Sequence, residues 1–255
     1  MTWRRRAAVA AFGLTAGCAT ASPILAPARV LPPEKVELDL GTALVAPVGT
    51  GTLDEARQRT ASNEQIIRSA VAYAMTPPGV VPYFSGRAGL GHGAEGSLAL
   101  IGRTVRIGAR RELVRDGDFT LSAGLAGRFA FIAGALDGLM PDFVVQRSSI
   151  YGGELSLVAG ITRTRIYDVW LGLRGGYQRS DATVQATAIQ PLSFDLGAHR
   201  VEAAAAFGLR VGFGRLSAAI EIDLRMAWSV GGRAGESVDA LTWALVPAGA
   251  IAWRL

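Results

Sequence analysis

Strict alternation of apolar residues with small or charged ones is the feature that most constrains this 255-residue chain. After Gly214 and Arg215, every second position from 216 to 230 is apolar, and the positions between them hold Ser, Ala, Glu, Asp or Arg. Residues 241–255 repeat the pattern with Thr, Ala, Val and Arg on the second face. A period of two is that of a β-strand, whose successive side chains point to opposite faces. Neighbouring strands of this kind are typical of a transmembrane β-barrel, with lipid outside and the lumen inside.

The same alternation predicts eight strands between residues 80 and 255. These strands cover residues 81–91, 97–113, 118–132, 149–162, 166–180, 199–213, 216–230 and 240–255. In the second of them the apolar residues change phase near Gly102, which we interpret as a β-bulge. A ten-stranded barrel is the alternative, and it needs a turn at Gly102 and Arg103 and a further strand over residues 36–42. A soluble sandwich is disfavoured because its outer faces need more polar residues than the Ala, Gly and Ser found here.

The connections between the predicted strands differ in length. Tight turns are expected at residues 116–117, 162–165 and 214–215, and longer loops at 133–148, 181–198 and 231–239, with a short loop around His92. Short periplasmic turns and longer external loops are usual in bacterial barrels. The first strand is therefore expected to start, and the last to end, in the periplasm. Aromatic residues near both predicted strand ends, such as Phe119 and Trp228, indicate two interfacial girdles.

Charged side chains on the second face of the strands are expected to point into the lumen. They comprise Arg87, Arg106, Arg110, Arg128, Glu154, Asp168, Arg174, Glu202, Arg210, Glu221, Asp223 and Arg225, and Glu112 is expected to point inward as well. An eight-stranded barrel is only wide enough for side chains to fill it. Because an unpaired buried charge is costly, we expect a lumen plugged by salt bridges rather than an ion path.

The first residues have the layout of a secretory signal, predicted to cover residues 1–17. Arg4, Arg5 and Arg6 precede a short apolar run that ends before Cys18, the single cysteine. Residues 14–18 resemble the lipobox of bacterial lipoproteins, which implies that Cys18 is lipidated and begins the mature chain. The alternative is ordinary cleavage after Ala21, which discards Cys18. Loss of the three arginines lowers the formal net charge from +5 to +2, so the charge does not indicate a nucleic-acid partner.

Between the signal and the barrel, the sequence predicts a tether and a helix. Residues 18–52 are expected to form a lipid-anchored periplasmic linker, rich in proline and alanine near its start. Residues 53–75 are expected to form an amphipathic helix, capped by Thr52 and ended by Pro77 and Pro78. The helix either rests on the end of the barrel or contacts a membrane surface or partner.

Residues 80–255 resemble the small eight-stranded outer-membrane barrels of the OmpA and OmpX type. Ile251, Trp253 and Leu255 alternate as in the C-terminal signal read by the barrel-assembly machinery, with Leu255 where that family usually has Phe. The resemblance implies an all-β, antiparallel, up-and-down transmembrane barrel in the bacterial outer membrane, with its N-terminal segment in the periplasm. Outer-membrane lipid and the assembly machinery are the partners that it implies.

The sequence carries no specific functional motif, and we expect a structural or interaction protein whose outer loops and periplasmic segment serve envelope partners. A lipid-modifying enzyme of the PagP or PagL kind is the alternative, and a narrow channel comes third. An enzyme needs a nucleophile oriented by a base. The candidates are His92 and His199, both expected near the outer rim, with Ser180 and Asp181, but the His-x-Ser pattern of the PagL type is absent. One cysteine and two histidines leave little for a metal site, and no cofactor is expected.

Overall fold

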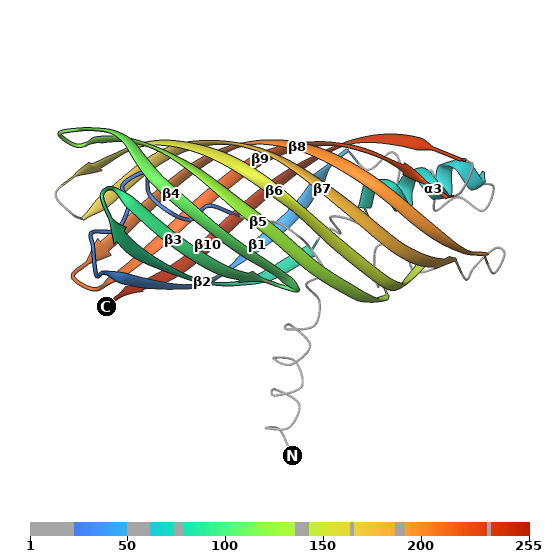
Figure 1. The fold of residues 1–255 in the computed structure, drawn as a ribbon, viewed down its shortest axis with the longest axis horizontal. Helices are drawn as coiled ribbons and strands as arrows, with labels where there is room; N and C mark the ends of the chain where they lie inside the picture. The colour runs from blue at the N-terminus through green and yellow to red at the C-terminus, as the bar shows by residue number, and fades with distance from the viewer. Residues whose placement is uncertain are drawn as a thin grey trace, which may run out of the picture.

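The computed structural model describes residues 23–49, 62–73, 79–135, 143–163, 166–186, 192–233 and 236–255. Its ten antiparallel strands form a closed up-and-down barrel in which each strand pairs with the next and β1 pairs with β10 (Figure 1). The strands are β1 (Val36–Val48), β2 (Gly79–Gly91), β3 (Ala94–Ile101), β4 (Thr104–Asp116), β5 (Phe119–Ala135), β6 (Phe143–Arg163), β7 (Tyr167–Ala186), β8 (Leu192–Phe213), β9 (Leu216–Gly232) and β10 (Val238–Arg254). Helix α3 (Asn63–Tyr73) lies between β1 and β2 in the chain.

The prediction of eight strands is wrong, and the ten-stranded alternative is correct. Gly102 adopts a positive φ of 58° and begins the reversal between β3 and β4, so the phase change there marks a turn and not a bulge. The second difference is β1, which closes the barrel by pairing Leu38 with Trp253 and Leu40 with Phe84. The barrel therefore begins at residue 36 rather than 80, and most of the second half of the predicted linker is a wall strand.

The two ends of the barrel differ. At the tight-turn end lie the start of β1, the end of β10 and short connections around residues 92–93, 117–118, 164–166 and 214–215. At the long-loop end lie the remaining connections, including α3, and Figure 1 shows the C terminus and α3 at opposite ends. His92 lies in the β2–β3 turn at the tight-turn end, so the prediction that it lies at the same rim of the barrel as His199 is wrong.

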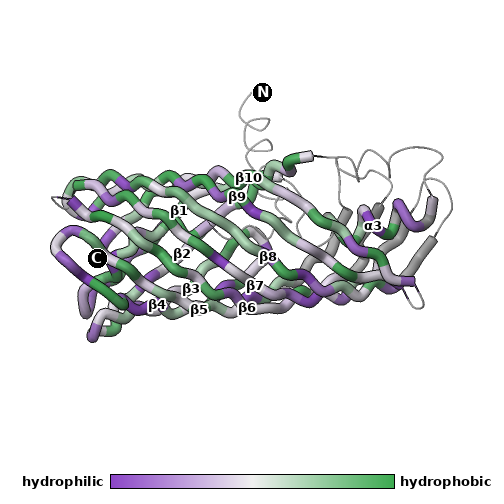
Figure 2. The backbone as a smooth tube through the Cα atoms, turned by 90° about the horizontal axis from the view of Figure 1, so that it is seen from above, coloured by the Kyte–Doolittle hydropathy of each residue, from purple (hydrophilic) through white to green (hydrophobic). Residues whose placement is uncertain are grey.

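The exterior of the barrel is an apolar band with a sharp boundary. On β7 the outward-facing Leu171, Leu173 and Tyr177 are 63%, 62% and 50% exposed. Two and four residues beyond Tyr177, the same face presents Arg179 and Asp181, whose charged groups lie 3.7 Å apart. Figure 2 shows hydrophobic and hydrophilic stretches alternating along the strands of the barrel.

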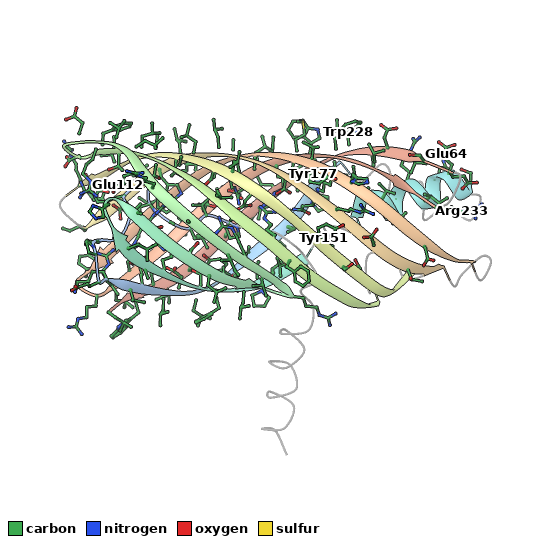
Figure 3. The ribbon with its side chains drawn as sticks, viewed as in Figure 1. Glu64, Glu112, Tyr151, Tyr177, Trp228 and Arg233 are labelled. Atoms are coloured by element: carbon green, nitrogen blue, oxygen red, sulfur yellow. The ribbon has the colours of Figure 1, made fainter. Side chains whose placement is uncertain are left out.

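Aromatic side chains mark both edges of this band. Trp253 and Trp243 face outward on β10, 49% and 41% exposed and ten residues apart. Ten residues of strand span about 33 Å, and a tilt of about 40° reduces this to about 25 Å, the usual height of the apolar band of a membrane barrel. Tyr177 and Trp228 also project outward, and Tyr177 lies next to the charged Arg179 and Asp181 on β7 (Figure 3).

Helix α3 lies at the long-loop end against β9 and β10. Ser62 and Gln65 form a reciprocal cap: the backbone N–H of Gln65 donates to Ser62 Oγ at 3.3 Å, and that of Ser62 donates to Gln65 Oε1 at 2.8 Å. Ile67 and Val71 are fully buried. Thr52, the predicted cap, lies outside the described residues. Within the described ranges, no helix is long and apolar enough to cross a membrane.

Candidate functional site

The twelve predicted lumen charges lie on the inward face of their strands, and all but Arg106 and Asp168 are buried. Arg128 forms an ion pair with Glu154 and another with Glu202, the latter at 2.6 Å. Arg106 Nε lies 2.6 Å from the same Glu154 carboxylate. Two cations and two carboxylates from four strands therefore join across the bore.

Two more of the predicted charges meet around Asp223. Arg174 of β7 donates a hydrogen bond to its carboxylate, and Arg225 lies 3.8 Å from the same oxygen. Arg110 pairs with Glu95 at 2.7 Å. Asp168 lies near the tight-turn end, on the wall of a cavity described below.

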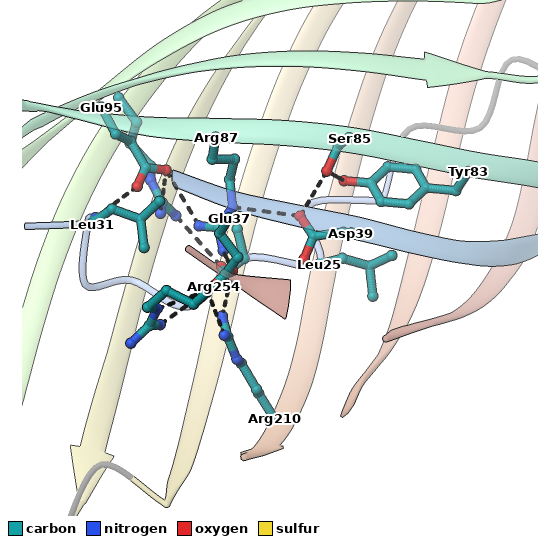
Figure 4. A network of polar contacts seen from close by, with 12 residues as sticks. Leu25, Leu31, Glu37, Asp39, Tyr83, Ser85, Arg87, Glu95, Arg210 and Arg254 are labelled. Atoms are coloured by element: carbon teal, nitrogen blue, oxygen red, sulfur yellow. Dashed lines mark hydrogen bonds and ion pairs between the residues drawn. The ribbon is translucent and has the colours of Figure 1, made fainter. Parts of the chain in front are cut away.

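A third cluster centres on Glu37, a carboxylate that the sequence analysis assigned to the linker. Three guanidinium groups surround it (Figure 4): Arg210 binds both carboxylate oxygens at 2.7 and 2.6 Å, Arg254 Nη2 lies at 3.0 Å, and Arg87 donates to Oε1. Glu37 is fully buried. It was missed because β1 was not among the eight strands, although its alternation with Val36 and Leu38 was the available signal.

Asp39 and Glu95 are the other carboxylates that the sequence analysis did not place in the lumen. Tyr83 Oη donates to Ser85 Oγ at 2.8 Å, and Ser85 Oγ donates to Asp39 at 2.7 Å. Arg87 lies between the two carboxylates, 3.7 Å from Asp39 and 3.5 Å from Glu95 (Figure 4). The lumen network is thus larger than predicted, because β1 and β3 add their own inward charges.

Residues 23–35, which we call the plug segment, run inside the lumen toward the tight-turn end and lead into β1. Glu221 accepts hydrogen bonds from the backbone N–H groups of Ile24 and Leu25 at 2.6 and 2.9 Å, and from Trp170 Nε1 at 2.9 Å. Backbone groups that are buried inside a barrel need hydrogen-bond partners within the protein. This part of the chain has no secondary structure, so a wall carboxylate supplies the acceptors.

The same arrangement recurs nearer the tight-turn end. The N–H of Val30 donates to Glu112 and that of Leu31 donates to Glu95, both at 2.9 Å. Prolines occupy four positions of the plug segment, and proline has no N–H to satisfy. The carboxylates of Glu221, Glu112 and Glu95 therefore accept hydrogen bonds from four of the remaining backbone N–H groups of the plug segment.

The wall is shaped to admit the plug segment. A Cβ atom at Gly89 would lie 2.0 Å from the backbone oxygen of Pro32, and one at Gly172 would lie 2.8 Å from Ile24 Cδ1. Leu25 packs in an apolar cluster of the lumen that includes Tyr83 and Trp170. A cavity of about 40 Å³ separates the segment from the neighbouring wall. The plug segment and the charge network together fill this part of the bore.

A larger cavity of about 610 Å³, which we call the vestibule, lies at the tight-turn end. The plug segment forms one wall through residues such as Pro27 and Val30, and strand ends and turns form the rest, including Gly91 and Arg215. Glu112, which lines it, is drawn at this end in Figure 3, opposite Glu64 and Arg233.

The residues proposed for an enzyme are not brought together. His199 lies on the exterior of β8, where its Nδ1 is 2.5 Å from Tyr177 Oη and the two rings stack. Ser180 is buried, on the inward face of β7, whereas Asp181 faces outward. His92 lies at the other end of the barrel. In the parts of the chain that the structure describes, no group of three or more His, Cys, Asp or Glu residues is placed to hold a metal ion.

No protein-family model and no curated protein matches this chain. Among solved structures, the chain is similar to the outer membrane protease OmpT of Escherichia coli (5% identity, 89% of this chain and 100% of that chain, TM-score 0.43). It is also similar to the attachment invasion locus protein Ail of Yersinia pestis (8% identity, 88% and 99%, TM-score 0.34). A third is a major outer membrane protein of Thermus thermophilus (10% identity, 86% and 99%, TM-score 0.35).

Proposed function

We propose that the chain is a bacterial outer-membrane β-barrel with a sealed lumen, which acts as a structural and interaction protein. The apolar exterior supports membrane insertion, because it matches the hydrocarbon core in height and carries aromatic residues at both edges. A soluble protein does not expose leucine, isoleucine and phenylalanine all around its wall.

For the orientation, we propose that the tight-turn end faces the periplasm and the long-loop end faces the outside. The strands β6, β7 and β8 extend past the aromatic band at the long-loop end, and Thr183 and Asp195 form a hydrogen bond of 2.8 Å on this extension. In bacterial outer-membrane barrels the longer connections lie on the extracellular side. In this orientation α3 lies on the outer side, in contrast to the periplasmic helix that the sequence suggested. The C-terminal end of the plug segment, next to β1, lies at the periplasmic end.

The plug segment is the observation that carries the sealed-barrel proposal. Its backbone is held by Glu221, Glu112 and Glu95, and its apolar side chains pack on the wall. The test is ion conductance in a planar lipid bilayer. The full chain is expected to give no steps, and a chain lacking residues 23–33 is expected to give them.

Heat-dependent gel mobility serves as the folding control for both proteins, because folded barrels resist SDS until boiled. Equal conductance of both folded proteins would contradict a sealing role for the segment. The mass of the complex extracted in mild detergent tests the interaction role. A species above one chain with its detergent belt is expected, and a lone chain would contradict it.

We infer binding rather than catalysis, supported by the separation of His92, His199 and Ser180. We also propose that Cys18 is lipidated and anchors the chain. Cys18 and the predicted signal 1–17 lie outside the described residues, and the mass of the mature N-terminal peptide tests both. A peptide that begins after Ala21 without acyl chains would overturn lipidation.

A further inference from the structure

The vestibule gathers positive charge from parts of the chain that are far apart in the sequence. Arg29 and Lys35 come from the plug segment, Arg115 from the end of β4, Arg215 from the β8–β9 turn and Arg254 from the end of β10. The carboxylates on its lining are Glu112 and Asp168. Folding therefore brings an excess of cations to one concave surface.

Part of this charge is neutralised within the protein, and part is not. At the vestibule floor Arg87, Arg210 and Arg254 contact Glu37, and Arg87 also lies within 4 Å of Asp39 and Glu95. Arg115 forms an ion pair with Glu112. Arg29 donates to the carbonyl of Gly117 at 3.2 Å, and it makes no ion pair within 4 Å to any residue that the structure describes.

Lys35 and Arg215 are exposed at the mouth of the cavity. Among the described residues, neither of them makes an ion pair within 4 Å. They are thus the cations most readily available to a ligand, one on the plug segment and one on the wall.

The shape and chemistry of the vestibule suit a small polyanion. A volume of about 610 Å³ falls in the range of pockets that hold small molecules. Guanidinium groups bind phosphate and carboxylate oxygens through paired hydrogen bonds. Because Lys35 and Arg215 flank the end of β10, a ligand with two or more anionic groups can contact the plug segment and the wall at once.

We propose that the vestibule binds a small soluble molecule carrying at least two phosphate or carboxylate groups. Its floor is formed by the inward-facing Arg87 and Arg210, within the ring of strands and away from the lipid-facing exterior. A soluble ligand reaches this floor along the barrel axis, whereas a lipid headgroup stays outside the wall. Since Arg29 and Lys35 belong to the plug segment, the bound ligand also ties that segment to the wall.

Calorimetric titration of the folded full chain in neutral detergent with inorganic tripolyphosphate tests the proposal. Saturable binding is expected, and added phosphatidylglycerol in the micelles is expected to leave it unchanged. The double variant Lys35→Gln, Arg215→Gln is expected to weaken binding about tenfold or more, because each charged hydrogen bond contributes that order of affinity. The matched control Arg163→Gln, Arg179→Gln removes two exposed arginines outside the vestibule and is expected to leave affinity within about twofold.

Absence of saturable binding, or equal weakening in the control, would overturn the proposal. Displacement of tripolyphosphate by phosphatidylglycerol would show that the vestibule binds a lipid headgroup, and would overturn the proposal that its ligand is a soluble molecule. A measurement on the unmodified chain guards against a variant that fails to fold: tripolyphosphate is expected to slow trypsin cleavage after Arg29 and Lys35, and unchanged cleavage counts against the site. Neither the calorimetric titration nor the trypsin cleavage depends on conductance, so the proposal of a sealed lumen and the proposal of a ligand site in the vestibule can be refuted separately.

Discussion

The plug segment and helix α3 lie in opposite parts of the barrel and are held in different ways. The plug segment has no internal hydrogen-bond ladder, and wall carboxylates such as Glu221 accept its N–H groups. Helix α3 satisfies its own backbone and is capped by Ser62 and Gln65. The helix packs on β9 and β10, where inward-facing residues such as Ala240 are small, and its Ile67 and Val71 are buried. The difference teaches that an irregular segment depends on specific polar partners, whereas a helix needs only a complementary surface.

Glu221→Ala is expected to have the largest effect, because it removes the acceptor of three donors: the buried Leu25 N–H and Trp170 Nε1–H, and the partly buried Ile24 N–H. We expect a loss of roughly 3 kcal/mol from the free energy of unfolding, with release of the plug segment to trypsin, while hydrogen exchange of α3 stays unchanged. Urea unfolding in lipid and limited proteolysis measure the two effects. Asp118→Ala, which removes an exposed carboxylate, is the matched control. A plug segment still protected in folded Glu221→Ala would show that polar anchoring is dispensable.

Gly89→Ala tests the fit of the plug segment by steric means. Its Cβ would lie 2.0 Å from the oxygen of Pro32, whereas no atom lies within 4 Å of a Cβ at Gly175. We expect Gly89→Ala to lower the free energy of unfolding by about 2 kcal/mol and to speed cleavage at Arg29. The control Gly175→Ala is expected to change neither. If both variants behave alike, close packing does not hold the plug segment.

Val71→Ala is expected to have the smallest effect, and to destabilise helix α3 rather than the plug segment. Removing two methyl groups from a fully buried side chain costs about 1.5 kcal/mol. Faster hydrogen exchange in α3, with unchanged cleavage of the plug segment, is the expected result. Glu64→Ala, on an exposed position of the same helix, is the control. Loosening of the plug segment by Val71→Ala would show that the two elements are coupled.

The strand faces could be predicted from the sequence because side-chain direction in a strand is a local property. Alternation alone placed Arg128, Glu154 and Glu202 in the lumen, and they are buried there. The strand number could not be predicted in the same way. A phase change at Gly102 is compatible with a bulge or a turn. The pairing of β3 with β4 shows a turn there, and this pairing together with that of β1 with β2 and β10 gives ten strands rather than eight.

The contacts that fill the lumen required the tertiary structure. Glu37 and Arg210 are 173 residues apart, and Ile24 and Glu221 are 197 residues apart, so no local pattern joins them. The sequence by itself determined an alternating, apolar-faced wall and the kind of charges that line it. The closed register alone decided which charges meet, where the plug segment binds and where the cations of the vestibule gather, because these depend on strand order around a ring.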